Sequence, residues 1–159
     1  MKKTLIMILI ISAVLTSCSR DTTDYSSLEI EGIVNNIVEH APVEFGYCDV
    51  SDYYMENFFS ELQGLQEYRI YTCNESSNFN EFGVFKFADV NDASDGMKVI
   101  RRYLETAKTE FENGIIYDIN EYPKFTNAKV ERVGLYLIYT VLNRNESDSA
   151  FTAIKQTTK

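Results

Sequence analysis

The chain has 159 residues, of which 45% are hydrophobic, and its formal charge is −9. This length suffices for one domain with a real core and is too short for two ordinary domains. A strongly negative protein lacks the basic patch that nucleic-acid and polyanion partners require, so we expect an acidic domain with no nucleic-acid partner.

The N-terminus has the layout of a secretory signal. Two lysines precede an apolar run from Leu5 to Leu15, and small and polar residues follow. The run is far shorter than the roughly 20 apolar residues of a membrane-spanning helix. Cleavage before Cys18 places Leu15 at the third position before the cut, where an ordinary signal peptidase prefers a small residue.

The motif Leu15-Thr16-Ser17-Cys18 resembles the lipobox of bacterial lipoproteins, in which the cysteine receives a diacylglyceryl group before cleavage. A thiolate can form a thioether that water does not hydrolyse. Two acyl chains attach a protein stably, whereas one chain holds it only marginally. We therefore expect residues 1–17 to be a signal peptide and Cys18 to be the lipidation site, on the extracytoplasmic face of the cell membrane. The alternative is a plain secreted protein.

The polar residues after the cysteine show no apolar period, so residues 18–27 form the lipidated cysteine and a flexible tether. Loss of the two signal lysines moves the formal charge from −9 to −11. Residues 28–159 remain as a single domain. The sequence predicts no internal repeat in it.

Two helices open this domain. Ser26 and Glu29 form a capping box, apolar residues recur at helical spacing from Ile30, and Pro42 stops the chain. A second helix is predicted over residues 52–62, where five apolar or aromatic residues fall on one stripe and Gly64 follows the end.

A hairpin and a long helix come next. Residues 67–73 and 81–88 are rich in aromatic and β-branched residues and flank a turn-forming segment, which is typical of a hairpin. Asn91 or Asp92 can cap the helix that follows, and Asn113-Gly114 ends it. Its apolar residues recur at steps of three and four, namely Met97, Ile100, Leu104, Ala107 and Phe111.

A second hairpin and a last helix complete the chain. Residues 127–133 and 135–142 flank Gly134, and a helix begins at about Ser147. The strand over residues 135–142 is apolar at nearly every position, so both of its faces should be covered. The order is helix, helix, hairpin, helix, hairpin, helix, which predicts an α+β fold with an antiparallel sheet of about four strands.

The sequence also resembles a known family in several segments: the lipobox, the strand "NEFGVFKFADV", the helix "GMKVIRRYLETAKTEFEN", the Tyr122-Pro123 loop and the closing "NAKVERVGLYLIYTVL". Together they are similar to a family of small lipoproteins of Gram-positive bacteria whose domain is of unknown function. The resemblance runs from about Phe58 to the C-terminus. It implies an extracytoplasmic lipoprotein and transfers no catalytic residue.

The usual signatures of catalysis and metal binding are missing from the sequence. His40 is the one histidine in the sequence. It lies near the end of the first predicted helix, where a histidine side chain interacts favourably with the exposed carbonyl groups, so we assign it a structural role. Residues 89–96 carry several acids, but Ala93, Ser94 and Ile100 occupy positions where a calcium loop needs other residues. Helix capping explains these acids better, and we expect no metal and no cofactor.

Cys48 and Cys73 are the two thiols that remain after lipidation. Outside the cytoplasm they could form a disulfide, although a buried cysteine is also simply a small apolar residue. Neither lies in a C-x-x-C motif or beside a histidine, so a zinc site is not predicted.

The aromatic residues raise the possibility of a sugar-stacking surface. Core positions account for Tyr54, Phe58, Phe85, Phe87 and Phe111, which leaves Tyr25, Tyr47, Tyr53 and Tyr122 freer. Two functions stay open. The first is a non-enzymatic module that binds an envelope protein or wall component, and the second is a small envelope hydrolase that uses a carboxylate pair. No spacing of acids selects such a pair.

Overall fold

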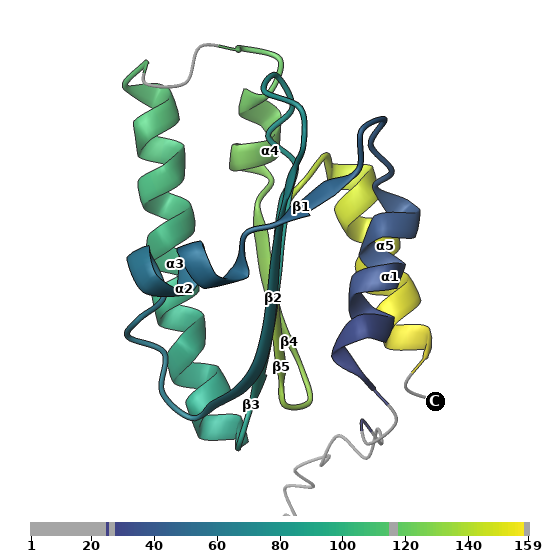
Figure 1. Ribbon diagram of the computed structural model, residues 1–159, viewed down its shortest axis with the longest axis vertical. Coiled ribbons are helices and arrows are strands. Elements are labelled where there is room, and N and C mark those ends of the chain that lie inside the picture. Colours follow the sequence, from purple (N-terminus) through teal and green to yellow (C-terminus); the bar gives the residue numbers. More distant parts are fainter. Residues whose placement is uncertain (1–24, 26–27, 115–117, 158–159) are drawn as a thin grey trace, which may run out of the picture.

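The computed structural model describes residue 25, residues 28–114 and residues 118–157, so the predicted signal, Cys18 and most of the tether lie outside the described residues. The described part holds five helices and one antiparallel sheet of five strands. This confirms the α+β fold and both predicted hairpins. Figure 1 shows three layers. One face of the sheet carries α1 (Ile30–His40) and α5 (Arg144–Gln156), and the other carries α2 (Ser51–Asn57), α3 (Val90–Glu112) and α4 (Tyr122–Thr126).

The sheet has the strand order β1-β2-β3-β5-β4, and every neighbouring pair is antiparallel. Its strands are β1 (Tyr47–Asp49), β2 (Leu65–Cys73), β3 (Glu81–Phe87), β4 (Lys129–Val133) and β5 (Tyr136–Val141). The sequence predicted about four strands and missed β1, because three residues are too few to show an alternating pattern. Backbone pairing with the end of β2 holds β1 in place.

Strand β5 confirms the prediction of an interior strand covered on both faces. It pairs with β3 on one side and β4 on the other, and all six of its residues are buried. Tyr136 and Ile138 pack toward the layer of α1 and α5, whereas Leu137 and Tyr139 pack toward α3. Gly83 on β3 makes room for the Tyr139 ring, since a Cβ there would lie 2.2 Å from Cε1 of Tyr139.

Helices α1 (Ile30–His40) and α5 (Arg144–Gln156) form one outer layer. Their apolar faces pack on the sheet and on each other around Ile33, Ile37 and Ile154, none of which is exposed. The predicted capping box at the start of α1 is wrong in its position. The helix begins at Ile30, so Glu29 is the N-cap residue, and it makes no side-chain cap.

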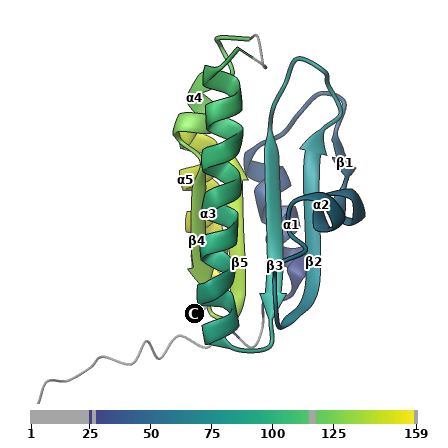
Figure 2. The ribbon, with the colours of Figure 1, turned by 90° about the vertical axis from the view of Figure 1, so that its left-hand side faces the viewer.

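Helix α3 (Val90–Glu112) is the long helix that the apolar period predicted, and it runs along the front of the sheet in Figure 2. The N-cap is Asp89 and not Asn91 or Asp92: its Oδ1 accepts from the N–H groups of Asn91 at 2.7 Å and Asp92 at 3.0 Å. Capping is therefore the role of Asp89, the first acid of this segment. Gly114, with a φ of +77°, follows the end of the helix as expected.

Two short helices share the layer of α3. Helix α2 (Ser51–Asn57) is shorter than predicted, because Phe58 leaves the helical conformation and the chain turns so that Phe59 and Leu62 reach the core. Helix α4 (Tyr122–Thr126) was not predicted; Pro123 lies in its first turn. Among the described residues, no helix has the length and apolar character needed to cross a membrane.

Candidate functional site

A single glutamate at the start of β3 defines the candidate site. Glu81 pairs with Thr72 of β2 and Val141 of β5, and the alternation along the strand directs its side chain to the face covered by α3. The next residue, Phe82, packs on the opposite face with α1 and α5. An acidic side chain thus lies where the apolar pattern of β3 would place a core residue.

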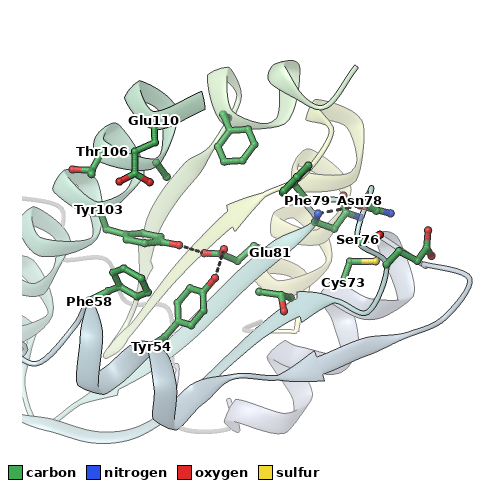
Figure 3. Close-up of a pocket in the computed structure, with 15 residues that line it drawn as sticks. Tyr54, Phe58, Cys73, Ser76, Asn78, Phe79, Glu81, Tyr103, Thr106 and Glu110 are labelled. Carbon is green, nitrogen blue, oxygen red and sulfur yellow. Dashed lines mark hydrogen bonds between the residues drawn. The ribbon is translucent and has the colours of Figure 1, made fainter. Parts of the chain in front are cut away.

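Three tyrosine hydroxyls, one each from α2, α3 and β5, donate to the Glu81 carboxylate. The Tyr54 hydroxyl lies 2.9 Å from Oε2, and those of Tyr103 and Tyr139 lie 2.8 and 2.7 Å from Oε1. Figure 3 shows Tyr54 of α2 and Tyr103 of α3 both pointing toward Glu81. The carboxylate therefore joins four separate elements.

Burial among aromatic rings dominates the electrostatics of this cluster. It raises the pKa of Glu81 above its ordinary value, and the three hydrogen bonds oppose that rise. Burial and the nearby carboxylate raise the pKa of Tyr54, Tyr103 and Tyr139 as well, so these tyrosines keep their protons. The cluster consists of three firm donors around one acceptor.

The three hydrogen bonds use most of the acceptor positions of the Glu81 carboxylate. A carboxylate has about four acceptor positions. Two hydroxyls occupy Oε1 and one occupies Oε2, so about one acceptor position stays open, on Oε2. This arrangement fixes the carboxylate rigidly and still allows one contact from outside.

The Glu81 pocket is the cavity that opens beside this carboxylate, with a volume of about 380 Å³. Pockets of this size bury small organic ligands. Five aromatic residues and three glutamates form most of its wall, namely Tyr54, Phe58, Tyr103, Phe79, Phe125, Glu75, Glu81 and Glu110. Phe58, Thr106 and Glu110 are exposed to solvent, so the rim of the pocket is accessible.

A buried ion pair holds the loop that closes one end of the pocket. Lys124 and Glu121 of the α4 region lie 2.6 Å apart, and their side chains are 6% and 13% exposed. Lys124 also donates to Oδ1 of Asn78, and Glu121 accepts from the N–H of Phe79. These bonds attach the segment between β2 and β3 to α4, and so position the Phe79 side of the pocket.

Cys48 and Cys73 lie on neighbouring strands and are not joined by a disulfide. Cys48 pairs with Thr72, and Cys73 pairs with Tyr47, so alternation puts the two side chains on opposite faces of the sheet. Both thiols are free. Burial raises the pKa of Cys73, which keeps its thiol protonated. A disulfide between them, one of the two alternatives that the sequence left open, would require rearrangement of β1.

The other residues singled out in the sequence have structural roles. His40 is the last residue of α1, as predicted, and its Nδ1 lies 2.8 Å from the carbonyl oxygen of Asn36. Within the described ranges, no group of three or more histidines, cysteines or acids is arranged to hold a metal ion.

The aromatic predictions were correct for most core rings and wrong for Phe58, which is 44% exposed. Of the tyrosines expected to be freer, Tyr53 is exposed, but Tyr47 and Tyr122 are half-buried and donate to Ala41 and Glu112. The sequence pattern did not reveal the site, because it marks Tyr54 only as a core ring. The usable signal was Glu81, an acid at the head of an otherwise apolar strand.

Comparison with known proteins places this site inside a family domain. A search of the curated proteins and a search of the solved structures each returned no match. The family described as "Domain of unknown function (DUF4358)" matches residues 52–142, a segment that includes Glu81 and its three tyrosine partners but neither α1 nor α5. Because the match covers more than half of the chain, the chain belongs to this family.

Proposed function

We propose that this protein is a lipid-anchored binding module of the cell envelope and that the Glu81 pocket is its binding site. One observation carries the proposal: a cavity of about 380 Å³ contains a carboxylate that three tyrosine hydroxyls hold in a fixed position. Binding sites combine apolar walls with a few well-placed polar groups, as this cavity does.

The N-terminal sequence supports the lipid anchor. Leu15-Thr16-Ser17-Cys18 follows a short apolar run, and a diacylglyceryl group on Cys18 would supply the two chains that stable attachment needs. In this proposal residues 1–17 are removed, residues 18–27 tether the protein to the outer face of the membrane, and residues 28–159 form the exposed domain, as in lipoproteins of Gram-positive bacteria.

The surroundings of Glu81 favour binding over catalysis. A carboxyl that acts as a general acid or base must exchange a proton with the substrate, and the exchange is easiest when one oxygen is free. Here three phenol groups with raised pKa donate to Glu81 and do not give up their protons. Such a cluster suits recognition of a ligand by a fixed negative group.

A small envelope hydrolase is the second candidate. The observation that favours it is the raised pKa of Glu81, because a general acid needs a carboxyl that holds its proton near neutral pH. Glu75 and Glu110 also line the pocket and could supply a second carboxylate. The binding test below separates the two candidates.

The anchor is tested by replacing Cys18. We expect the wild-type chain in the membrane fraction, with a diacylglyceryl group on its N-terminal peptide by mass spectrometry. Cys18→Ser should release the protein from the membrane, since no thioether can form. An unmodified Cys18 in membrane-bound wild-type protein would contradict the anchor.

The pocket is tested by filling it. Thr106 and Thr109 both lie exposed on α3, and each hydroxyl bonds to the carbonyl four residues before it, but only Thr106 lines the pocket. Thr106→Trp should therefore fill the pocket, and Thr109→Trp is its matched control. The full-length chain in neutral detergent is immobilised and exposed to an envelope extract, and retained components are identified by mass spectrometry.

We expect wild type and Thr109→Trp to retain the same component and Thr106→Trp to lose it. The component should keep its mass after prolonged incubation with wild type. Cleavage by wild type and not by Glu81→Gln would replace the binding proposal with the hydrolase. Equal retention by all three proteins, or retention by none, would overturn the pocket as the binding site.

A further inference from the structure

The charged groups that line the Glu81 pocket all have one sign. Glu75, Glu81 and Glu110 line it, and within the described part of the chain no lysine or arginine does. The connected cation is Lys124, which reaches Asn78 of the lining but is already neutralised by Glu121 at 2.6 Å. Phosphate and carboxylate ligands would be repelled here, and a positive ligand would be attracted.

The walls of the pocket are aromatic. The rings of Tyr54, Phe58 and Tyr103 lie 5.1 to 6.1 Å apart and are inclined to one another by 53° to 68°. Phe79 and Phe125 form a second ring pair, 6.1 Å apart, at another side of the lining. Aromatic faces attract a cation that has lost part of its water, and ammonium groups bind against such rings.

These two features together select an organic cation over a metal ion. A hard metal ion takes six or more oxygen ligands, whereas the Glu81 carboxylate retains about one open acceptor position. One acceptor and several ring faces suit an ammonium group, which needs a single charge contact and tolerates apolar neighbours. The cavity volume of about 380 Å³ suits a ligand of the size of choline or a hexosamine.

We infer that the Glu81 pocket binds an organic ammonium group, with Glu81 as the counter-charge and Tyr54, Phe58 and Tyr103 as the aromatic wall. This inference rests on the proposed function, because it names the ligand class for the same pocket. The exposed rim at Phe58 and Thr106 leaves room for an ammonium group that is attached to a larger envelope molecule.

The test titrates the full-length chain in maltoside detergent and phosphate buffer, which is free of competing amines. Choline is compared with 3,3-dimethylbutan-1-ol, a neutral compound of the same shape, and glucosamine is compared with glucose. Calorimetry should show at least one cation binding about tenfold or more tighter than its neutral partner. The two pairs also distinguish a quaternary from a primary ammonium ligand.

Variants locate the binding in the pocket. Thr106→Trp should abolish it, and Thr109→Trp should leave it unchanged. Phe58→Leu keeps an apolar side chain but loses the ring, so affinity should fall roughly 2–5-fold. Glu81→Gln should weaken cation binding more than any change at Phe58; because Glu81 also joins four elements, its result counts only if the melting temperature stays close to that of wild type.

Each outcome decides the inference. Equal affinity for a cation and its neutral partner, binding of neither cation, or binding that survives Thr106→Trp would overturn it. One outcome is that neither cation binds in the titration, while the retention assay still shows a component that wild type retains and Thr106→Trp does not. In that case the ammonium inference is wrong and the proposed function stands. If the retention assay fails as well, both are wrong.

Discussion

The two faces of the sheet are built from alternate residues of the same strands, yet their chemistry differs. The face toward α1 and α5 is packed mainly with aliphatic residues such as Ile33, Ile37 and Ile138. The face toward α3 mixes aliphatic residues with more of the large buried rings, because Phe59, Phe85, Phe87 and Tyr139 are all fully buried there. The second face carries the Glu81 pocket.

The tyrosines of β5 show what this difference means. On the first face, the Tyr136 hydroxyl donates to the backbone carbonyl of Leu28 at 2.6 Å. On the second face, the Tyr139 hydroxyl donates to the Glu81 carboxylate at 2.7 Å. A ring with a polar tip can thus either finish a core or build a polar site inside it, and the partner of the hydroxyl decides which.

The largest expected effect on stability tests whether both faces of β5 are fully buried. Ile138 and Leu137 are adjacent on β5, point to opposite faces and are not exposed. Replacement of either by alanine should lower the free energy of unfolding by about 2–5 kcal/mol, through lost transfer energy and a cavity. Urea unfolding of both variants measures this. A nearly neutral result for one of them would mean that its face is open.

The next effect compares the two tyrosine hydroxyls directly. Tyr139→Phe removes a bond to a carboxylate and should cost about 1.5–3 kcal/mol, whereas Tyr136→Phe removes a bond to a neutral carbonyl and should cost about 0.5–1.5 kcal/mol. Chemical denaturation near pH 8 gives both values. An equal or reversed order would contradict the view that Glu81 makes the α3 face electrostatically special.

The pH dependence of stability tests the burial of Glu81. Its raised pKa means that the folded state holds this proton more tightly than the unfolded state, in which glutamate titrates near 4.5. The stability of wild type relative to Glu81→Gln should therefore decline as the pH rises above 4.5 and through the raised pKa of Glu81. The difference in unfolding free energy between the two proteins is followed from pH 4 to pH 8.

The opposite slope would have a clear meaning. If wild type gained stability over Glu81→Gln as the pH rose, the three tyrosine hydrogen bonds would outweigh burial, and the pKa of Glu81 would be lowered.

The smallest expected effect lies at the rim of the pocket. Phe58 is 44% exposed, so Phe58→Leu should change the free energy of unfolding by less than about 0.5 kcal/mol. Thermal and urea unfolding check this. A loss comparable to that of Leu137→Ala would show that Phe58 belongs to the core of the α3 face and not to the pocket rim.

Local patterns predicted most of the elements but not all of their lengths. The hairpins follow from alternation and turn residues near each other in the sequence, and α3 follows from a regular apolar period between Met97 and Phe111. The length of α2 does not follow from the local pattern. Its apolar stripe continues past Asn57, although the backbone leaves the helix at Phe58. Strand β1 depends on pairing with β2, which no pattern within three residues can reveal.

The sequence by itself determined the fold class, the two-sided burial of β5, the cap-rich start of α3 and the motif on which the lipid anchor rests, because each is encoded by residues close together in the chain. The tertiary structure decided the site. Tyr54, Tyr103 and Tyr139 lie 27, 22 and 58 positions from Glu81, on three different elements. The sequence pattern is the same for a tyrosine whose hydroxyl binds a carboxylate and for one whose ring only packs in the core. The partner of the hydroxyl is determined by the packing of elements that are distant in sequence.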